Sequence, residues 1–209
     1  ALRASEIREV NRFSFNFQNF QTMARVIDEN LRRHWNLVLG TCIKYYPARL
    51  KVGAEQAADR EKMYRFKDGT DQEEAARWTA SQLASRFGDK VRSIVFACIP
   101  ASSAEKNRIR YEAFSQRVCE LCGAVNGFPF IKVKEDADTL HESRTKRSKM
   151  SDRFGNIEIE GSFFRGKEIC CYDDCLTSGK SWNSFANKLE SLGAVVLGAY
   201  FYGKTTYKL

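Results

Sequence analysis

The sequence lacks several features that would place it in other protein classes. It has no apolar run that approaches the roughly 20 residues needed to cross a bilayer, so we expect no membrane partner. Its first ten residues are charged and lack the apolar core of a secretory signal, which favours a cytoplasmic location. The first residue is alanine, so a processed or trimmed start stays open. Internal repeats and low-complexity tracts are absent as well.

The residues for a usual zinc site are also missing. Cys119 and Cys122 have CxxC spacing, but no second CxxC is present, and His34 and His141 stand alone. We therefore interpret the pair as ordinary helix cysteines. The seven cysteines are an odd number, and several lie in or beside a predicted core strand, as is typical of reduced thiols in a cytoplasm.

What is present indicates a globular α/β protein. The 209 residues are 43% hydrophobic and 12% aromatic, enough for one domain with a modest extra subdomain. The formal net charge of +8 favours an anionic partner, but it does not distinguish a nucleic acid from a phosphorylated small molecule.

The first third of the chain is less regular than the rest. Alternating phenylalanines predict a half-buried strand over 13–17, helical spacing predicts a helix over 23–31, and the charged segment 51–62 is expected to be a loop or a surface helix. We expect a hood or extension over residues 1–63 and a core domain over residues 64–209.

The predicted core alternates strands and helices. Strands are expected at 64–69, 94–99, 128–133, 157–159, 168–172 and 194–202. The first helix is expected to begin at a capping box of Asp71 and Glu74 and to end at Gly88. A second is expected from about residue 105, with an apolar side that reaches Val125. A third is expected to follow the turn that ends at residue 181 and to end at Gly193. This order implies right-handed crossovers and a mostly parallel sheet, with ligands bound at the carboxyl ends of the strands.

The segment that follows the apolar run 168–172 carries the most chemical information. The turn Thr177-Ser178-Gly179-Lys180-Ser181 opens a helix, so its backbone N–H groups and the positive helix end form a cradle suited to a phosphate. Its hydroxyls can donate to the same group, and Gly179 permits a backbone angle and a close approach that a Cβ would obstruct.

Two acids lie just before that turn. The carboxylates of Asp173 and Asp174 can accept hydrogen bonds from sugar hydroxyls or stabilise Mg²⁺, directly or through water. A nucleotide P-loop is a poor fit, because it needs a glycine where Asp174 stands. A simple turn and helix cap stays an alternative, although it does not explain why two acids follow an apolar strand.

This segment is similar to the motif of type I phosphoribosyltransferases that binds 5-phosphoribosyl-1-pyrophosphate (PRPP). In both, an apolar strand is followed by two aspartates, here Asp173-Asp174, then by two residues and a turn, here Thr-Ser-Gly-Lys-Ser. The resemblance implies that the two aspartates bind the 2- and 3-hydroxyls of the ribose, with Mg²⁺ as cofactor. It also implies that Thr177 to Ser181 bind the 5-phosphate. Lys180 departs from the family pattern, in which a small or apolar residue is commoner, so it either points to solvent or adds charge to the phosphate site.

A second segment resembles the pyrophosphate loop of the same family. The strand at 94–99 runs into Pro100 and the small residues Ala101, Ser102 and Ser103, and the basic residues Arg108 and Arg110 follow. This layout is most similar to the ComF-type branch, although the four-cysteine zinc ribbon of that branch is lacking, so the resemblance covers residues 64–209. An ordinary strand-to-helix turn is the alternative.

The basic stretch 143–149, with Arg144, Lys146 and Arg147, lies where type I enzymes carry a mobile loop over the substrate. A solvated basic loop or a surface for nucleic acid phosphates explains it equally well.

The resemblance implies transfer of phosphoribosyl from PRPP to an unknown nitrogen acceptor, with release of pyrophosphate. The alternative is a non-catalytic protein that senses PRPP or associates with nucleic acid, as in ComF-like relatives. The general base and the oligomeric state, including a homo-oligomer, stay open. Aromatic residues of the first third could stack on an acceptor base, although core packing is the expected use of most of them; they are Phe13, Phe15, Phe17, Tyr45 and Tyr46.

Overall fold

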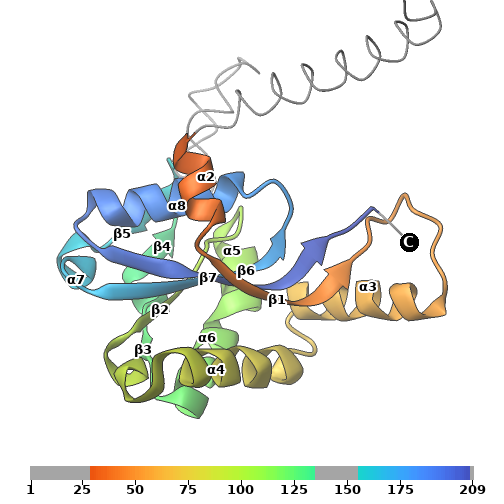
Figure 1. Cartoon of the computed structure of the whole chain (residues 1–209), viewed down its shortest axis with the longest axis horizontal. Helices are drawn as coiled ribbons and strands as arrows, with labels where there is room; N and C mark the ends of the chain where they lie inside the picture. Colours follow the sequence, from red (N-terminus) through yellow and green to blue (C-terminus); the bar gives the residue numbers. More distant parts are fainter. Residues whose placement is uncertain (1–28, 135–154, 208–209) are drawn as a thin grey trace, which may run out of the picture.

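A five-stranded parallel sheet forms the centre of the protein, as seen in a computed structural model that describes residues 29–134 and 155–207. The strand order is β3-β2-β6-β7-β1 (Figure 1). The strands are β1 (Val38–Tyr45), β2 (Val95–Cys98), β3 (Val125–Asn126), β6 (Glu168–Leu176) and β7 (Val195–Thr205). The predicted parallel sheet and its apolar strands at 94–99, 168–172 and 194–202 are therefore confirmed.

Helices cover both faces of this sheet. One face is packed by α3 (Ala54–Lys67), α4 (Glu73–Phe87) and α6 (Ala113–Cys122), and the other by α7 (Gly161–Phe164) and α8 (Lys180–Ser191). In β6, Cys170 and Tyr172 enter the first core, whereas Ile169 and Cys171 enter the second. Because both faces are buried, the strand is apolar without alternation.

The order of the strands creates a switch point beside β2. The chain passes from β2 to β3 on one side, whereas β6 lies on the other side of β2 and continues outward to β7. The connections therefore diverge between β2 and β6, and a crevice forms at the carboxyl ends of these two strands. This topology places the loop after β2 beside the turn after β6.

A small second sheet shares a hydrophobic core with the main one but is not hydrogen-bonded to it. It pairs β4 (Ile131–Val133) with β5 (Ile157–Ile159) in antiparallel fashion, which confirms the predicted strand at 157–159. The single strand expected over 128–133 is instead split between a 3₁₀ turn, η3 (Phe128–Phe130), and β4. Pro129 within the turn has no N–H for a sheet hydrogen bond, which explains the break.

The strand expected at 64–69 is wrong, because these residues form the last turn of α3 and the loop after it. Met63 and Phe66 are three residues apart and both fully buried, so the helical period decides the structure. The prediction of a capping box formed by Asp71 and Glu74 is wrong as well. Helix α4 begins at Glu73 with Gln72 at its N-cap and no side-chain cap, and Glu74 pairs with Lys62 at 3.0 Å instead.

The helix expected from about residue 105 consists of three pieces. Helix α5 (Ala104–Asn107) continues into a π-helical turn, η2 (Arg108–Glu112), and then into α6. It ends at Gly123 with a positive φ of 80°, so Val125 belongs to β3 and not to the apolar side of the helix. The ends predicted at Gly88 and Gly193 agree with the structure, since both glycines have positive φ just after α4 and α8.

The described part of residues 1–63 belongs to the same unit as the rest. Strand β1 pairs with β7 in the main sheet, and the boundary expected after residue 63 falls inside α3. The predicted strand at 13–17 and most of the predicted helix at 23–31 lie outside the described residues. Among the helices of the described ranges, none is long and apolar enough to cross a membrane.

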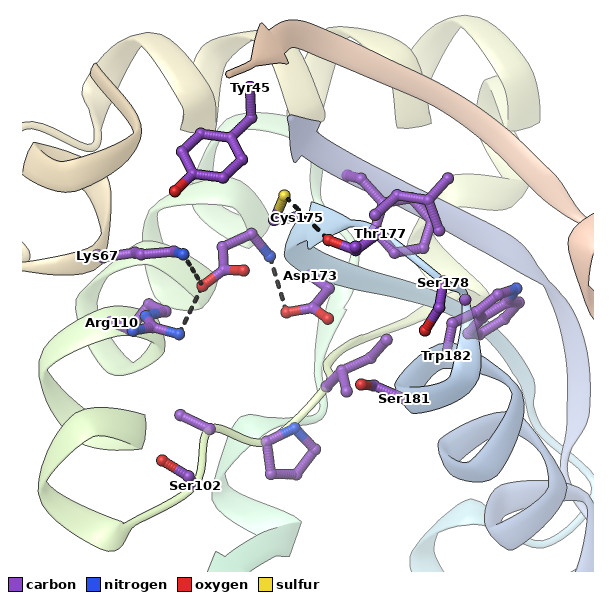
Figure 2. A pocket seen from close by; sticks show the side chains of 17 residues that line it. Tyr45, Lys67, Ser102, Arg110, Asp173, Cys175, Thr177, Ser178, Ser181 and Trp182 are labelled. Atoms are coloured by element: carbon purple, nitrogen blue, oxygen red, sulfur yellow. Dashed lines mark hydrogen bonds and ion pairs between the residues drawn. The ribbon is translucent and has the colours of Figure 1, made fainter. Parts of the chain in front are cut away.

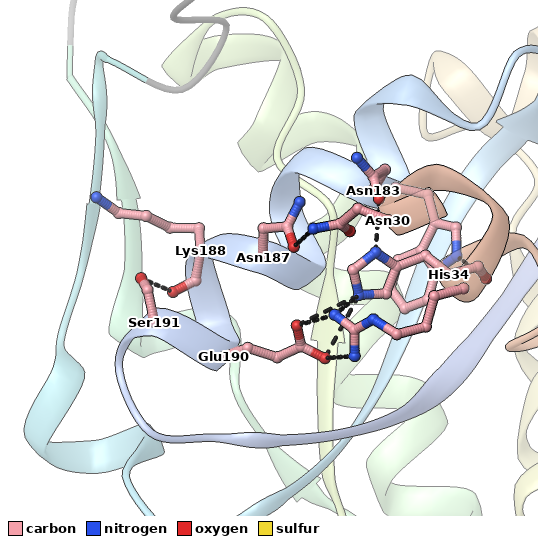
Figure 3. A network of polar contacts seen from close by, with 9 residues as sticks. Asn30, His34, Asn183, Asn187, Lys188, Glu190 and Ser191 are labelled. Atoms are coloured by element: carbon pink, nitrogen blue, oxygen red, sulfur yellow. Dashed lines mark hydrogen bonds and ion pairs between the residues drawn. The ribbon is translucent and has the colours of Figure 1, made fainter. Parts of the chain in front are cut away.

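Helix α2 (Glu29–Trp35) is fastened to α8 by a polar network (Figure 3). The side chain of His34 is fully buried, and its Nδ1 lies 2.6 Å from Asn183 Oδ1. Arg33 pairs with Glu190 at 2.5 Å, and Trp182 Nε1 donates to the His34 carbonyl at 2.8 Å. The network fixes the end of α2 beside the start of α8, next to the turn at 177–181.

Candidate functional site

A pocket of about 300 Å³ lies at the carboxyl ends of β2 and β6 (Figure 2). It brings together most of the residues that the sequence indicates as a site, namely Ala101, Ser102, Arg110, Asp173, Asp174, Thr177, Ser178, Gly179 and Ser181. Ser103, Arg108 and Lys180 do not line it. The basic residues Arg144, Lys146 and Arg147 lie outside the described residues.

The turn after β6 has the geometry of an anion cradle. Gly179 adopts φ +73° and ψ −2°, and helix α8 begins directly after it. Ser178 and Ser181 lie on the same side of the pocket in Figure 2. Backbone N–H groups at the start of a twelve-residue helix, together with the positive helix end, favour a bound phosphate.

Thr177 and Lys180 differ from their expected roles in this turn. Thr177 Oγ1 lies 2.7 Å from Thr205 Oγ1 at the end of β7, so its hydroxyl is engaged with that strand. Lys180 is exposed and outside the pocket, which agrees with the solvent-facing option of the two that the sequence left open.

Gly179 is required for a close approach, but the approaching group belongs to the protein. A Cβ at this position would lie 2.7 Å from the indole ring of Trp35, the last residue of α2. Trp35 therefore packs against the turn at 177–181. The positive φ agrees with the prediction from the sequence, whereas the neighbour that excludes a Cβ was not predicted.

The two aspartates have different partners. Strand β6 continues through both of them to Leu176, so successive side chains leave it in different directions. Asp174 Oδ2 accepts from Arg110 Nη1 at 2.5 Å and lies 4.0 Å from Lys67 Nζ. Asp173 is paired with no cation among the described residues: its Oδ1 accepts from the Tyr111 hydroxyl at 2.8 Å and from the Asp174 backbone N–H at 2.8 Å.

These environments shift the protonation of several groups. Burial, with the charge of Asp174 as a second cause, raises the pKa of Asp173 to about 7, although the hydrogen bond from Tyr111 works in the opposite direction. Burial raises the pKa of Tyr111 well above its usual value, so this side chain remains a hydroxyl donor. Burial lowers the pKa of Arg110, but the charges of Asp174 and its neighbours outweigh it and the net shift is upward.

The loop after β2 contributes less backbone to the pocket than the sequence indicated. The Ala101 N–H donates to the Asn107 side chain at 3.0 Å, so this amide is already used within the protein. Ser103 caps α5 by accepting from the Lys106 N–H at 3.3 Å, and Arg108 is exposed. Of the basic residues predicted after this loop, Arg110 alone lines the pocket.

Sequence reasoning missed two residues of the site, Lys67 and Tyr111. Lys67 lines the pocket from the end of α3, a segment that the sequence assigned to a strand. Tyr45, one of the aromatics considered for base stacking, lines the pocket from the end of β1, and Lys67 Nζ lies 5.5 Å from the centre of its ring. Tyr46 is buried at 5% exposure and packs in the core. Only the position at the carboxyl end of a parallel strand could have indicated Tyr45.

The donor set for a metal ion is small. No group of three or more histidine, cysteine or acidic side chains gathers anywhere in the described ranges. Of the two carboxylates predicted to hold Mg²⁺, Asp174 is paired with Arg110, so Asp173 is the donor that suits the ion if a ligand's oxygens and water complete the coordination. Cys119 and Cys122 both lie in α6, and burial raises the pKa of Cys119 to about 12.

No protein-family model matches the chain, and a search of curated proteins finds no significant match. The functional argument therefore depends on the residues and geometry of this pocket.

Proposed function

We propose that the chain binds PRPP in this pocket and transfers its phosphoribosyl group to a nitrogen acceptor, as a type I phosphoribosyltransferase of ComF-like layout. One observation carries the proposal. A turn suited to phosphate, a carboxylate bonded to neutral donors and a pair of cations line a single pocket at the switch point of a parallel sheet. A volume of about 300 Å³ is at the lower end of the range for small-molecule pockets.

The arrangement gives each part of the ligand its own partners. The 5-phosphate binds the backbone N–H groups of the turn and the hydroxyls of Ser178 and Ser181. In Figure 2, Asp173 lies between that turn and the side formed by Lys67 and Arg110, so the ribose hydroxyls meet its carboxylate. The pyrophosphate then extends toward Ser102, Arg110 and Lys67.

The reaction breaks the bond between C1 of the ribose and the pyrophosphate oxygen, which leaves with the electron pair. A bond from C1 to the acceptor nitrogen forms, and the proton that this nitrogen loses passes to solvent. Negative charge grows on the departing pyrophosphate, where Arg110 and Lys67 are cations able to stabilise it. Binding of the 5-phosphate orients C1 for attack. Magnesium held by the Asp173 carboxylate with oxygens of the ligand would neutralise part of the leaving-group charge.

Two linked measurements test this function. Isothermal titration with PRPP and Mg²⁺ is expected to show saturable binding at one site, and a pyrophosphate-release assay over a panel of nitrogen bases is expected to identify an acceptor. Asp173→Asn should weaken the binding and abolish the release. Binding without any release would replace the enzyme with the PRPP-sensing alternative, and absence of binding would contradict both.

A further inference from the structure

The Tyr111 hydroxyl lies between the two aspartates of the site. It donates to Asp173 Oδ1 at 2.8 Å and lies 3.2 Å from the backbone N–H of Asp174, from which it accepts. The residue is fully buried, and its ring packs beside Phe66 with the ring centres 6.4 Å apart. The hydroxyl therefore uses both its donor and its acceptor capacity on the end of β6.

These contacts leave Asp173 with one oxygen for a ligand. The Tyr111 hydroxyl and the Asp174 N–H both donate to Oδ1 of Asp173. The Asp173 side chain lines the pocket, so Oδ2 is the oxygen that a ligand there would meet. Asp174 differs, because its Oδ2 is held by Arg110 and approached by Lys67. Among the described residues, neutral hydrogen-bond donors thus orient the Asp173 carboxylate, whereas cations orient the Asp174 carboxylate.

The backbone that carries Tyr111 is itself held in place. Tyr111 and Arg110 are adjacent in the π-helical turn η2, and they contact Asp173 and Asp174 respectively. The Gln72 side chain donates to the Arg110 carbonyl at 2.7 Å, and Gly69 is so close that a Cβ would lie 2.8 Å from the Ile109 carbonyl oxygen. Single π turns inside helices are frequent at functional sites.

We propose that Tyr111 is a positioning residue for sugar recognition: its hydroxyl fixes the Asp173 carboxylate so that the second oxygen accepts from a ribose hydroxyl. The inference rests on the proposed function, since it concerns the same pocket. Tyr111 acts through Asp173 and does not touch the ligand. Without the hydroxyl, the carboxylate loses one of the two donors that set its orientation, and recognition of the sugar's hydroxyls weakens.

The test compares ribose 5-phosphate with its 2,3-dideoxy analogue, because both carry the phosphate and only one carries the hydroxyls. We expect the wild-type protein to bind ribose 5-phosphate more tightly. Tyr111→Phe keeps the ring and should reduce this preference by about fivefold, the factor that one hydrogen bond carries. The affinity for the dideoxy analogue should change little. Both dissociation constants come from one preparation, so a smaller folded fraction cancels in their ratio.

Tyr172→Phe is the matched control. Tyr172 is also fully buried, and within the described residues its hydroxyl makes no hydrogen bond to either aspartate, so the preference should stay at the wild-type value. A second arm repeats Tyr111→Phe in an Asp173→Asn background. There the substitution should have no further effect on the ratio, because a positioning residue acts only through the group it positions.

The outcomes separate this inference from the proposed function. A wild-type protein that binds neither sugar phosphate, or binds both equally, contradicts the proposed function itself. A wild-type preference that survives in Tyr111→Phe overturns the inference and leaves the function standing. Gln72→Leu, which removes the bond to the Arg110 carbonyl, is a second variant if Tyr111→Phe does not fold, and an unchanged ratio there overturns the inference too.

Discussion

Two neighbouring carboxylates at the end of β6 differ in charge environment, and this difference dominates the chemistry of the site. Asp174 is 7% exposed and is neutralised by Arg110 and Lys67. Asp173 receives a hydroxyl and an amide, which stabilise its charge less than a cation does, so burial raises its pKa to about 7. The ionised form of this half-buried acid therefore lowers the stability of the folded protein near neutral pH.

This cost predicts a pH dependence for unfolding. The folded-state pKa of Asp173 is raised above the value of about 4 in an unfolded chain, so its favourable contribution is fully present below about pH 4. It is lost as the pH rises to about 7. Asp173→Asn lacks the group, so the stability of the variant relative to wild type should increase from pH 4 to 7 and then level off. Urea unfolding at a series of pH values measures this, and parallel curves for the two proteins would contradict it.

Lys67 gives a second prediction at the residue scale. Its Nζ faces the pocket beside Arg110, so Lys67→Met should weaken PRPP binding by on the order of tenfold, as expected for a lost charge-assisted contact. Ribose 5-phosphate lacks the pyrophosphate and should be affected much less. Lys62→Met is the control on the same helix, because Lys62 pairs with Glu74 at 3.0 Å and lies outside the pocket. Equal losses in the two variants would remove Lys67 from the site.

At the scale of elements, the phosphate turn is confined between the sheet and helix α2. The network around His34 fastens α2 to α8, and Trp35 then packs against Gly179. The turn thus derives its shape from the strand and helix that flank it and from α2, which is far away in the sequence. A rigid turn is useful for phosphate binding, because its N–H groups need no reorganisation when the ligand arrives.

Substitution of Gly179 tests this confinement. Gly179 and Gly166 share a φ of +73°, but a Cβ at Gly166 meets nothing within 4 Å, whereas one at Gly179 would lie 2.7 Å from Trp35. Gly166→Ala should therefore lose about 1 kcal/mol of unfolding free energy from the backbone alone. Gly179→Ala should lose roughly 2–4 kcal/mol, because the displaced Trp35 adds to the strain. Denaturant unfolding gives both values, and equal losses would show that Trp35 does not confine the turn.

The elements that the sequence predicts best are those whose burial is complete. Strand β2 is an unbroken apolar run, so its place in the centre of the sheet follows from the residues alone. Strand β1 is an edge strand whose side chains are half-buried, and its sequence has neither a continuous apolar run nor an alternation to mark it. Lys67 and Tyr111 reach the site through tertiary packing of α3 and a π turn, for which no local sequence signal exists.

At the scale of the whole molecule, the excess of positive charge does not reside in the pocket. Lys67 and Arg110 face Asp173 and Asp174 there, so the formal charges of these four side chains balance when both acids are ionised, although the chain as a whole carries +8. The fold joins the turn after β6 to the loop after β2 at one crevice, and the proposed ligand specificity depends on this junction rather than on the net charge.

A crystal soaked with PRPP and Mg²⁺ tests the central claim most directly. The 5-phosphate should lie on the backbone N–H groups of residues 178–181, the ribose hydroxyls should meet Asp173, and the pyrophosphate should extend toward Arg110 and Lys67. A ligand bound elsewhere, or bound here with Asp173 turned away from the sugar, would contradict the assignment of this pocket.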